Sequence, residues 1–293
     1  VGEALGDGHP RAIITDIRLP DADGLSVVDM LVQQSIEIPV IAMTAYSDLD
    51  QAVSAFQKGV FEYLPKPFDL DQVISVVDRA VVNKDARPQR QAEPGGSRLL
   101  GESPAMQEVF RTIGRLSRSD ISVLITGETG SGKDVVARVL HDNSPRAGGP
   151  FVAINTAAIP AELLESELFG HEAGAFTGAT RSHQGRFERA DGGTLFLDEL
   201  GTMSMRLQEK LLRLVEYGEF ERVGGQETLQ VDVRVIAATN ADLRALASRG
   251  EFRHDLLDRL SFDIVPLPAL RHRQEDIPEL AEHFAIQMSA ELG

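Results

Sequence analysis

The stretch SVLITGETGSGK, residues 122–133, decides the fold class of this chain. It opens with an apolar, β-branched run that predicts a buried strand, and it ends in the pattern G-x-x-x-x-G-K from Gly127 to Lys133. Glycines in such a loop let backbone N–H groups turn inward around an anion, and the N-terminus of the next helix adds partial positive charge. A glycine-rich turn without a ligand is the alternative. The position between a strand and a helix favours a nucleoside triphosphate site in an α/β protein.

The residues of this loop are assigned to the nucleotide. Lys133 would reach the β- and γ-phosphates. The next residue, where the general motif has a Ser or Thr that holds Mg²⁺, is Asp134, so magnesium must depend on water and on a carboxylate elsewhere. The expected nucleotide contacts are Gly127, Glu128, Thr129, Gly130, Ser131, Gly132, Lys133 and Asp134.

A second strand supplies that carboxylate. GGTLFLDE, residues 192–199, is an apolar run ending in two acids, which predicts Asp198 as the magnesium ligand and Glu199 as the general base. An acidic pair at a strand end is by itself usually a solvated terminus, and the loop upstream makes it specific. Asn155 and Asn240 close two further strands and are placed to bond the γ-phosphate, the attacking water or Glu199. For Asn240 a cap on the following helix is equally compatible.

Composition limits the class of protein. The chain has 293 residues, 42% of them hydrophobic, which suffices for about two domains. It has no cysteine, so disulfides, thiolate catalysis and cysteine-ligated zinc are excluded. No membrane-length apolar run and no secretory signal is present, which predicts a cytoplasmic protein. The net charge of −16 suits phosphate-mediated DNA binding poorly, so a DNA-binding element is expected outside these residues.

The pattern of apolar residues divides the chain in two. Residues 1–83 alternate strands (11–17, 38–43 and 61–64) with helices (25–33, one from Ser47, and 70–82). Residues 84–98 are rich in Pro, Gly, Arg and Gln and predict a linker, with an ordered surface loop as the alternative. Residues 99–265 form a second strand–helix region, and a helical pattern occupies 266–293. Both regions predict parallel sheets with flanking helices.

Four motifs together carry a family resemblance. GETGSGKD (127–134), ELFGHEAGAFTGA (167–179), GGTLFLDE and FRHDLLDRL (252–260) resemble the AAA+ domain of sigma-54-dependent transcription activators, over essentially all of 99–293. The stretches at 43–68 and 105–128 resemble the response regulators of nitrogen assimilation in particular. The resemblance implies an AAA+ P-loop sheet with helices on both faces and a truncated helical lid. It also implies a flavodoxin-like receiver domain at 1–83 that lacks its first strands and their acidic pair.

The resemblance implies roles outside the nucleotide loop. GAFTGA would touch sigma-54 RNA polymerase, through Gly174, Ala175, Phe176, Thr177, Gly178 and Ala179. An exposed aromatic on a glycine-flanked turn suits such a contact, and a flexible loop with an incidental aromatic is the alternative. Arg253 and Arg259 match arginines that act on the γ-phosphate of a neighbouring subunit, although a surface ion pair remains plausible for Arg253. Asp134 conforms to the family, and Asn155 matches a residue that restrains Glu199.

The receiver half has its own candidate site. Asp16 ends an apolar strand and is placed to accept a phosphoryl group, with a turn aspartate as the alternative. Thr44 and Lys66, which follow the next two strands, match the hydroxyl and lysine that hold the phosphate, and Tyr63 matches the aromatic switch position.

The resulting hypothesis is an ATPase that activates transcription by sigma-54 RNA polymerase and uses ATP and Mg²⁺. Its expected partners are the polymerase, a sensor histidine kinase, other copies of the chain in a hexameric or heptameric ring, and upstream DNA held by a C-terminal domain outside these residues. Another AAA+ remodelling enzyme is the first alternative; GAFTGA argues against a chaperone and the acidic charge against a helicase. A nucleotide-binding fragment without turnover is the second, because a lid arginine of the family lies beyond Gly293.

Overall fold

The computed structural model describes residues 10–19, 22–34, 36, 38–44, 55–56, 58–66, 68–82 and 99–292. The start of the predicted helix from Ser47 and the predicted linker at 84–98 lie outside these residues, whereas residues 55, 56 and 58 are helical. The chain divides into two compact units. One contains the N-terminal elements with residues 99–118 and 270–292, and the other contains residues 119–269. In the described ranges no helix is both long and apolar enough to cross a membrane.

The first unit contains a three-stranded parallel sheet in the order β1-β4-β5. A short antiparallel hairpin, β2–β3, follows β1. The core of this sheet is formed by Ile41, Leu64, Val76 and Ala80. The bounds are β1 Ile13–Asp16, β2 Arg18–Leu19, β3 Ala22–Asp23, α1 Ser26–Gln33, β4 Val40–Thr44, β5 Glu62–Pro65 and α3 Leu70–Val82.

Two more helices belong to this unit. Helix α4 (Pro104–Leu116) starts as predicted, because the Ser103 hydroxyl accepts the N–H of Met106 and Pro104 opens the first turn. Helix α11 (Ile277–Leu292) follows two 3-10 turns, η3 (Leu270–His272) and η4 (Gln274–Asp276). The buried Asp276 carboxylate accepts the backbone N–H of Glu102 and Ser103 at 2.8 Å each, and also the Ser103 hydroxyl. It therefore ties the entry of α4 to the start of α11.

The second unit contains a five-stranded parallel sheet in the order β12-β6-β11-β8-β7. Four of its strands were predicted, and β12 was not. Strand β11 starts three residues later than predicted, because the N–H groups of Val231 and Asp232 bond Gly218 and the Asp191 side chain instead of a neighbouring strand. The bounds are β6 Val123–Thr126, β7 Phe151–Asn155, β8 Thr194–Asp198, β11 Arg234–Thr239 and β12 Asp263–Pro266.

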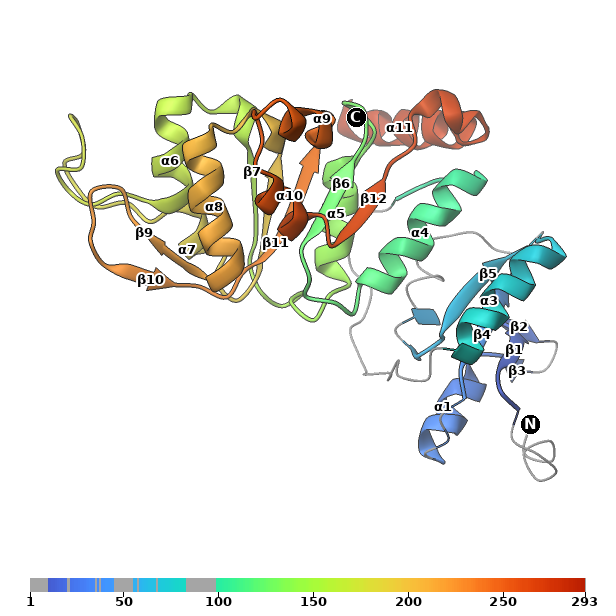
Figure 1. Ribbon diagram of the computed structural model, residues 1–293. Coiled ribbons are helices and arrows are strands. Elements are labelled where there is room, and N and C mark those ends of the chain that lie inside the picture. Colours follow the sequence, from blue (N-terminus) through green and yellow to red (C-terminus); the bar gives the residue numbers. More distant parts are fainter. Residues whose placement is uncertain are drawn as a thin grey trace. The chain divides into compact units, whose positions relative to one another are not determined.

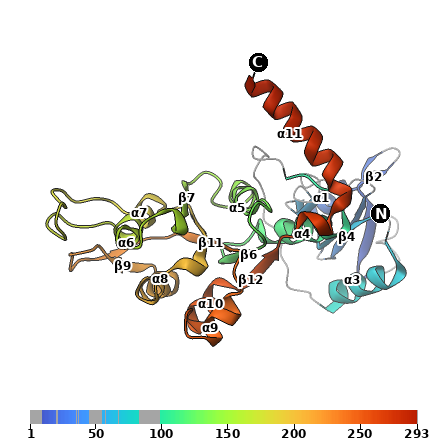
Figure 2. The same cartoon turned by 90° about the horizontal axis from the view of Figure 1, so that it is seen from above.

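Helices cover both faces of this sheet. Helix α5 lies over one face, and α8, α9 and α10 lie over the other (Figures 1 and 2). Ser204 and Asp242 cap α8 and α9 through their side chains. The remaining bounds are α5 Lys133–Asp142, η1 Thr156–Ala158, α6 Ala161–Phe169, α7 Arg186–Arg189, η2 Leu200–Thr202, α8 Met205–Tyr217, β9 Glu219–Glu221, β10 Thr228–Gln230, α9 Leu243–Ser248 and α10 His254–Leu260.

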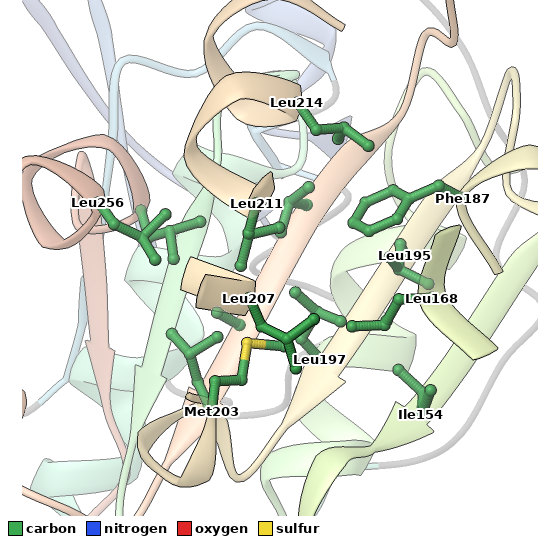
Figure 3. Packing of buried hydrophobic residues seen from close by; sticks show 14 of the residues in the cluster. Ile154, Leu168, Phe187, Leu195, Leu197, Met203, Leu207, Leu211, Leu214 and Leu256 are labelled. Atoms are coloured by element: carbon green, nitrogen blue, oxygen red, sulfur yellow. The ribbon is translucent and has the colours of Figure 1, made fainter. Parts of the chain in front are cut away.

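The main hydrophobic core lies between the α8–α10 face and strands β8 and β11. Figure 3 shows Leu195 and Leu197 of β8 beside Leu211 of α8 and Phe187 of α7, all fully buried. Arg234 at the start of β11 is a buried polar exception, and its guanidinium donates to the carbonyls of Ile121 and Leu140. Burial lowers the pKa of this guanidinium to about 10. The apolar core fixes α8 and the sheet as one body, so the strand ends keep a constant arrangement.

Replacing Leu211 with alanine tests this core. Leu211 is 0% exposed, so Leu211→Ala should lower the free energy of unfolding by about 2–5 kcal/mol through lost burial and a cavity. Leu163→Ala is the matched control, because Leu163 is 48% exposed, and its loss should stay below about 1 kcal/mol. Urea denaturation measures both values. Equal losses would contradict the placement of Leu211.

Candidate active site

The loop between β6 and α5 has the backbone that phosphate binding requires. Gly130 and Gly132 have φ of 80° and 97°, and nothing lies within 4 Å of a Cβ built on either residue. The left-handed backbone, and not crowding, therefore requires glycine at these positions. Lys133 is buried, and its ammonium donates to the carbonyls of Gly127 and Glu128 at 3.1 Å each. The loop thus surrounds a positive charge at the N-terminus of α5, which suits an anion.

The polar strand ends meet at one edge of the sheet. Asn155 and Asp198 are register partners on β7 and β8, and the Asn155 amide donates to Asp198 Oδ2 at 3.1 Å. The other Asp198 oxygen accepts the N–H of Glu199 at 2.9 Å. The sequence predicted that Asn155 would bond the γ-phosphate, the attacking water or Glu199. In this structure its hydrogen bond goes to Asp198, because parallel pairing sets these two side chains opposite each other.

Asn240 joins the strand end of β11 to the nucleotide loop. Its amide donates to the hydroxyl of Thr129 at 3.1 Å. The cap of the following helix is Asp242, whose carboxylate accepts the N–H of Ala245. Asn240 is therefore positioned toward the loop and does not serve as the cap of α9.

Glu199 has an unusual backbone. Among the described residues it is the one non-glycine residue with positive φ, at φ 56° and ψ 44°. Its carbonyl lies 2.8 Å from the hydroxyl of Thr156 and 2.9 Å from that of Thr202. Neither threonine was predicted as a site residue, and the only sequence signal is that Thr156 follows Asn155 directly. The two hydroxyls fix the turn that carries the glutamate.

The GAFTGA segment forms a closed turn between α6 and α7. The N–H of Gly174 donates to the carbonyl of Ala179 at 2.7 Å, and Gly174 and Gly178 have positive φ. Phe176 and Thr177 are exposed, although the Phe176 ring also meets the His171 ring edge-on at 4.9 Å between centroids. Figure 1 draws the segment between α6 and α7 as a loop extending away from the sheet. The tip is accessible to a partner.

An ion cluster holds the stem of this loop. Arg222, just after β9, donates to both oxygens of Glu188 at 2.9 and 2.6 Å and to Glu172 at 2.8 Å. Glu188 is on α7, and its side chain is 12% exposed. These two carboxylates raise the pKa of Arg222 above its ordinary value. The cluster was not predicted, because its members are 34 and 50 residues from Arg222 along the chain.

The two arginines predicted to act on the γ-phosphate of a neighbouring subunit both make ion pairs within the chain. Arg253 bonds Asp255, two residues later, at 2.7 and 3.0 Å. Arg259 bonds Glu216 of α8 at 2.9 Å. The side chain of Arg259 is 50% exposed, so it is accessible from outside the chain.

The receiver residues lie around the ends of β1, β4 and β5. The Lys66 ammonium bonds Asp16 at 2.5 Å, and the backbone N–H of Lys66 donates to the carbonyl of Thr44. The hydrogen bond from the Lys66 ammonium lowers the pKa of Asp16. Thr44 and Tyr63 are buried. The structure thus brings Asp16 and Lys66 together, with Thr44 on the neighbouring strand.

The carboxyl ends of β7 and β8, beside the loop at 127–133, fit a magnesium ion. In the described part of the chain no group of three or more His, Cys, Asp or Glu residues is arranged as a metal site. Magnesium in nucleotide sites typically takes one or two protein carboxylates and completes its shell with water and phosphate. The Asp198 carboxylate, at the carboxyl end of a strand and held by Asn155, matches that requirement.

Comparisons with known proteins agree with this geometry. Residues 99–265 match the sigma-54 interaction domain, and residues 2–78 match the response regulator receiver domain. The DNA-binding transcriptional regulator NtrC of Klebsiella pneumoniae is 54% identical, with 99% of this chain and 63% of that protein covered. NtrC of Azospirillum brasilense is 50% identical over 98% of this chain and 60% of that protein. The chain therefore spans less than two thirds of these curated relatives.

A solved structure is similar as well. The crystal structure of NtrX from Brucella abortus in complex with ATP is 38% identical, with a TM-score of 0.63, and the match covers 99% of this chain and 63% of that chain.

Removing Lys66 tests the Asp16 contact. Lys66→Met should raise the pKa of Asp16 toward its ordinary value, because the hydrogen bond that favours the carboxylate is lost. A carboxylate with a lowered pKa stabilises the fold at neutral pH, and this contribution disappears as pH falls through the folded-state pKa. NMR titration of the Asp16 carboxyl carbon measures the shift. Lys58→Met is the control, because Lys58 bonds Asp23 instead. An unchanged Asp16 titration in Lys66→Met would contradict the contact.

Proposed function

Since the chain belongs to the sigma-54 interaction domain family and carries a receiver domain before it, we propose that it is the ATP-hydrolysing part of a response regulator that activates transcription by sigma-54 RNA polymerase. The observation that carries the proposal is the presence, in one compact unit, of a phosphate-binding loop, an Asp–Glu strand end and the exposed GAFTGA turn. The NtrC relatives extend the proposal to nitrogen regulation. A protein that acts on RNA polymerase works in the cytoplasm.

Hydrolysis would take place at the sheet edge. The backbone amides of 127–132 and the Lys133 ammonium would bind the β- and γ-phosphates. Bound magnesium would neutralise phosphate charge, with Asp198 as its protein ligand. The Glu199 carboxylate would accept a proton as water attacks the γ-phosphorus and the bond to the bridging oxygen of ADP breaks. Asn155 would orient Asp198, and Asn240 with Thr129 would fix the loop beside the γ-phosphate.

A second copy of the chain would complete the reaction. Arg259 in the last turn of α10, or Arg253 at its N-cap, would leave its carboxylate partner and place a guanidinium on the γ-phosphate held by the neighbouring subunit. A head-to-tail contact of this kind is compatible with a closed ring, and the family resemblance favours a hexamer or a heptamer. The Glu216 side chain is 22% exposed and that of Arg259 is 50% exposed. Exchanging this carboxylate for a phosphate should cost little, because ion pairs at the surface contribute only about 0–1 kcal/mol.

The remaining parts would regulate and apply this activity. A sensor histidine kinase would transfer a phosphoryl group to Asp16, where Lys66 and Thr44 would hold it and Tyr63 would respond to it. The exposed Phe176 and Thr177 would contact the polymerase. The charge of −16 leaves recognition of upstream DNA to a segment outside these residues.

Thr177→Ala tests the role of the loop. Thr177 is exposed on the loop, and no hydrogen bond of its side chain to the nucleotide edge is present in the described ranges. We therefore expect ATP hydrolysis within about twofold of wild type and no open promoter complex in transcription assays with the full-length protein and sigma-54 polymerase. Loss of hydrolysis together with open-complex formation would contradict a contact role.

Subunit mixing tests the arginine in trans. Glu199→Gln and Arg259→Ala should each lower kcat by at least about 10²-fold. A mixture should regain ATPase activity, because one subunit supplies the base and its neighbour supplies the arginine. Specific activity of the wild type should also rise with protein concentration.

The control mixture combines Glu199→Gln with Asp198→Asn. Each of these subunits lacks a group of its own site, so every site in the mixture is defective and no activity returns. Absence of recovery in the first mixture would contradict an Arg259 that acts across the subunit boundary. Recovery in the control would contradict the placement of Asp198 and Glu199 in one site of the same subunit. Nucleotide binding without turnover in wild type at all concentrations would favour a non-catalytic binding protein.

A further inference from the structure

We propose that Thr156 and Thr202 are positioning residues for the general base, because their hydroxyls hold the left-handed turn at Glu199. The inference rests on the proposed hydrolytic function and adds two residues to it. The Thr156 hydroxyl lies 3.0 Å from the carbonyl of Asp198, 2.8 Å from the carbonyl of Glu199 and 3.0 Å from the Thr202 hydroxyl. The Thr202 hydroxyl lies 2.9 Å from the Glu199 carbonyl.

The conformation of Glu199 needs such support. A residue with a Cβ disfavours the left-handed region, and a residue held there persists only when its surroundings over-determine it. On the N-terminal side, the N–H of Glu199 donates to Asp198 Oδ1. On the C-terminal side, its carbonyl receives the N–H of Thr202 at 3.1 Å in addition to the hydroxyls. Each hydroxyl has one proton, so the pair can serve the carbonyls of Asp198 and Glu199 together.

The side chain of Glu199 depends on this backbone. Within the described part of the chain, its carboxylate makes no hydrogen bond and no ion pair. The main chain at 198–200 therefore sets the point and direction from which this side chain extends. A base must lie within hydrogen-bond reach of the water it activates, so a small rotation of this peptide reduces the rate.

The position of Thr156 joins the base to the proposed metal ligand. Thr156 is 2% exposed and is the first residue of η1, directly after Asn155. The Asn155 amide bonds the Asp198 carboxylate. The Thr156 hydroxyl bonds the backbone carbonyls of both Asp198 and Glu199. Adjacent residues after β7 thus orient the two acids at the end of β8.

Valine substitutions separate positioning from packing. Thr156→Val replaces the hydroxyl with a methyl group of similar size, and Thr156→Ser keeps the hydroxyl. We expect Thr156→Val to lower kcat about tenfold with KM for ATP and ADP affinity unchanged, and Thr156→Ser to retain most of the wild-type kcat. Thr202→Val should act in the same direction. The double valine variant should lose less than the product of the single losses, because both hydroxyls hold one turn.

The control is Thr112→Val in the full-length protein. The Thr112 hydroxyl bonds the carbonyl of Glu108 inside α4, so its removal should leave kcat unchanged. A wild-type kcat in Thr156→Val would overturn the proposal. Equal loss in Thr156→Ser and Thr156→Val would also overturn it, because shape and not the hydroxyl would then matter.

A structural measurement decides the inference without activity. The N–H of Thr202 donates to the Glu199 carbonyl, so amide hydrogen exchange at Thr202 should become faster in Thr156→Val, and a crystal structure of the variant should show a changed φ at Glu199. Unchanged amide exchange at Thr202 and an unchanged φ at Glu199 would contradict the positioning role of Thr156, even if the wild type hydrolysed no ATP. If Glu199→Gln hydrolyses ATP like the wild type, the assigned base is wrong and the proposed mechanism fails separately.

Discussion

The in-register parallel pairing of β7, β8, β11 and β6 is the constraint on which the candidate active site depends. Thr126 pairs with Thr239, Ala237 with Leu197, and Asn155 with Asp198. Because all these strands run in one direction, the loops after them open at a single edge. A slip of one residue in one strand would turn its side chains to the opposite face and separate Asp198 from Asn155. The apolar packing of α8 against β8 and β11 maintains that register.

Local features of the sequence predicted most of this arrangement. Strand patterns located β6, β7 and β8 at their observed ends, and the glycine pattern located the loop at 127–133. The capping residues Ser103 and Pro104 located the start of α4. These features succeed because a strand end, a cap or a left-handed glycine is decided by residues within a few positions along the chain.

Contacts between distant segments were not predictable in the same way. Strand β12 is four residues long and lies at the sheet edge, so its apolar run is too short to distinguish from a loop. Arg222 binds acids 34 and 50 positions away, and one arginine among many carries no signal of its partners. The hydrogen bond of Asn155 to Asp198 depends on the register between β7 and β8, and neither strand's own sequence specifies that register. Thr156 and Thr202 come together only after η1 and η2 have formed beside each other.

Arg222 and Arg259 differ in how firmly their carboxylate partners hold them, which bears on the proposed role of Arg259 in a neighbouring subunit. Arg222 makes three hydrogen bonds to the carboxylates of Glu172 and Glu188, and the Glu188 side chain is 12% exposed. Removing the guanidinium would leave the shielded Glu188 carboxylate without its cation. Within the described ranges Arg259 pairs with one carboxylate, that of Glu216, and its side chain is half exposed, so water and salt weaken that pair. A triphosphate in the proposed site of a neighbouring subunit would carry more charge than one carboxylate and would compete with it for the guanidinium. Arginine therefore holds the stem of the GAFTGA loop at position 222, and at position 259 it makes a pair that the proposed phosphate contact could replace.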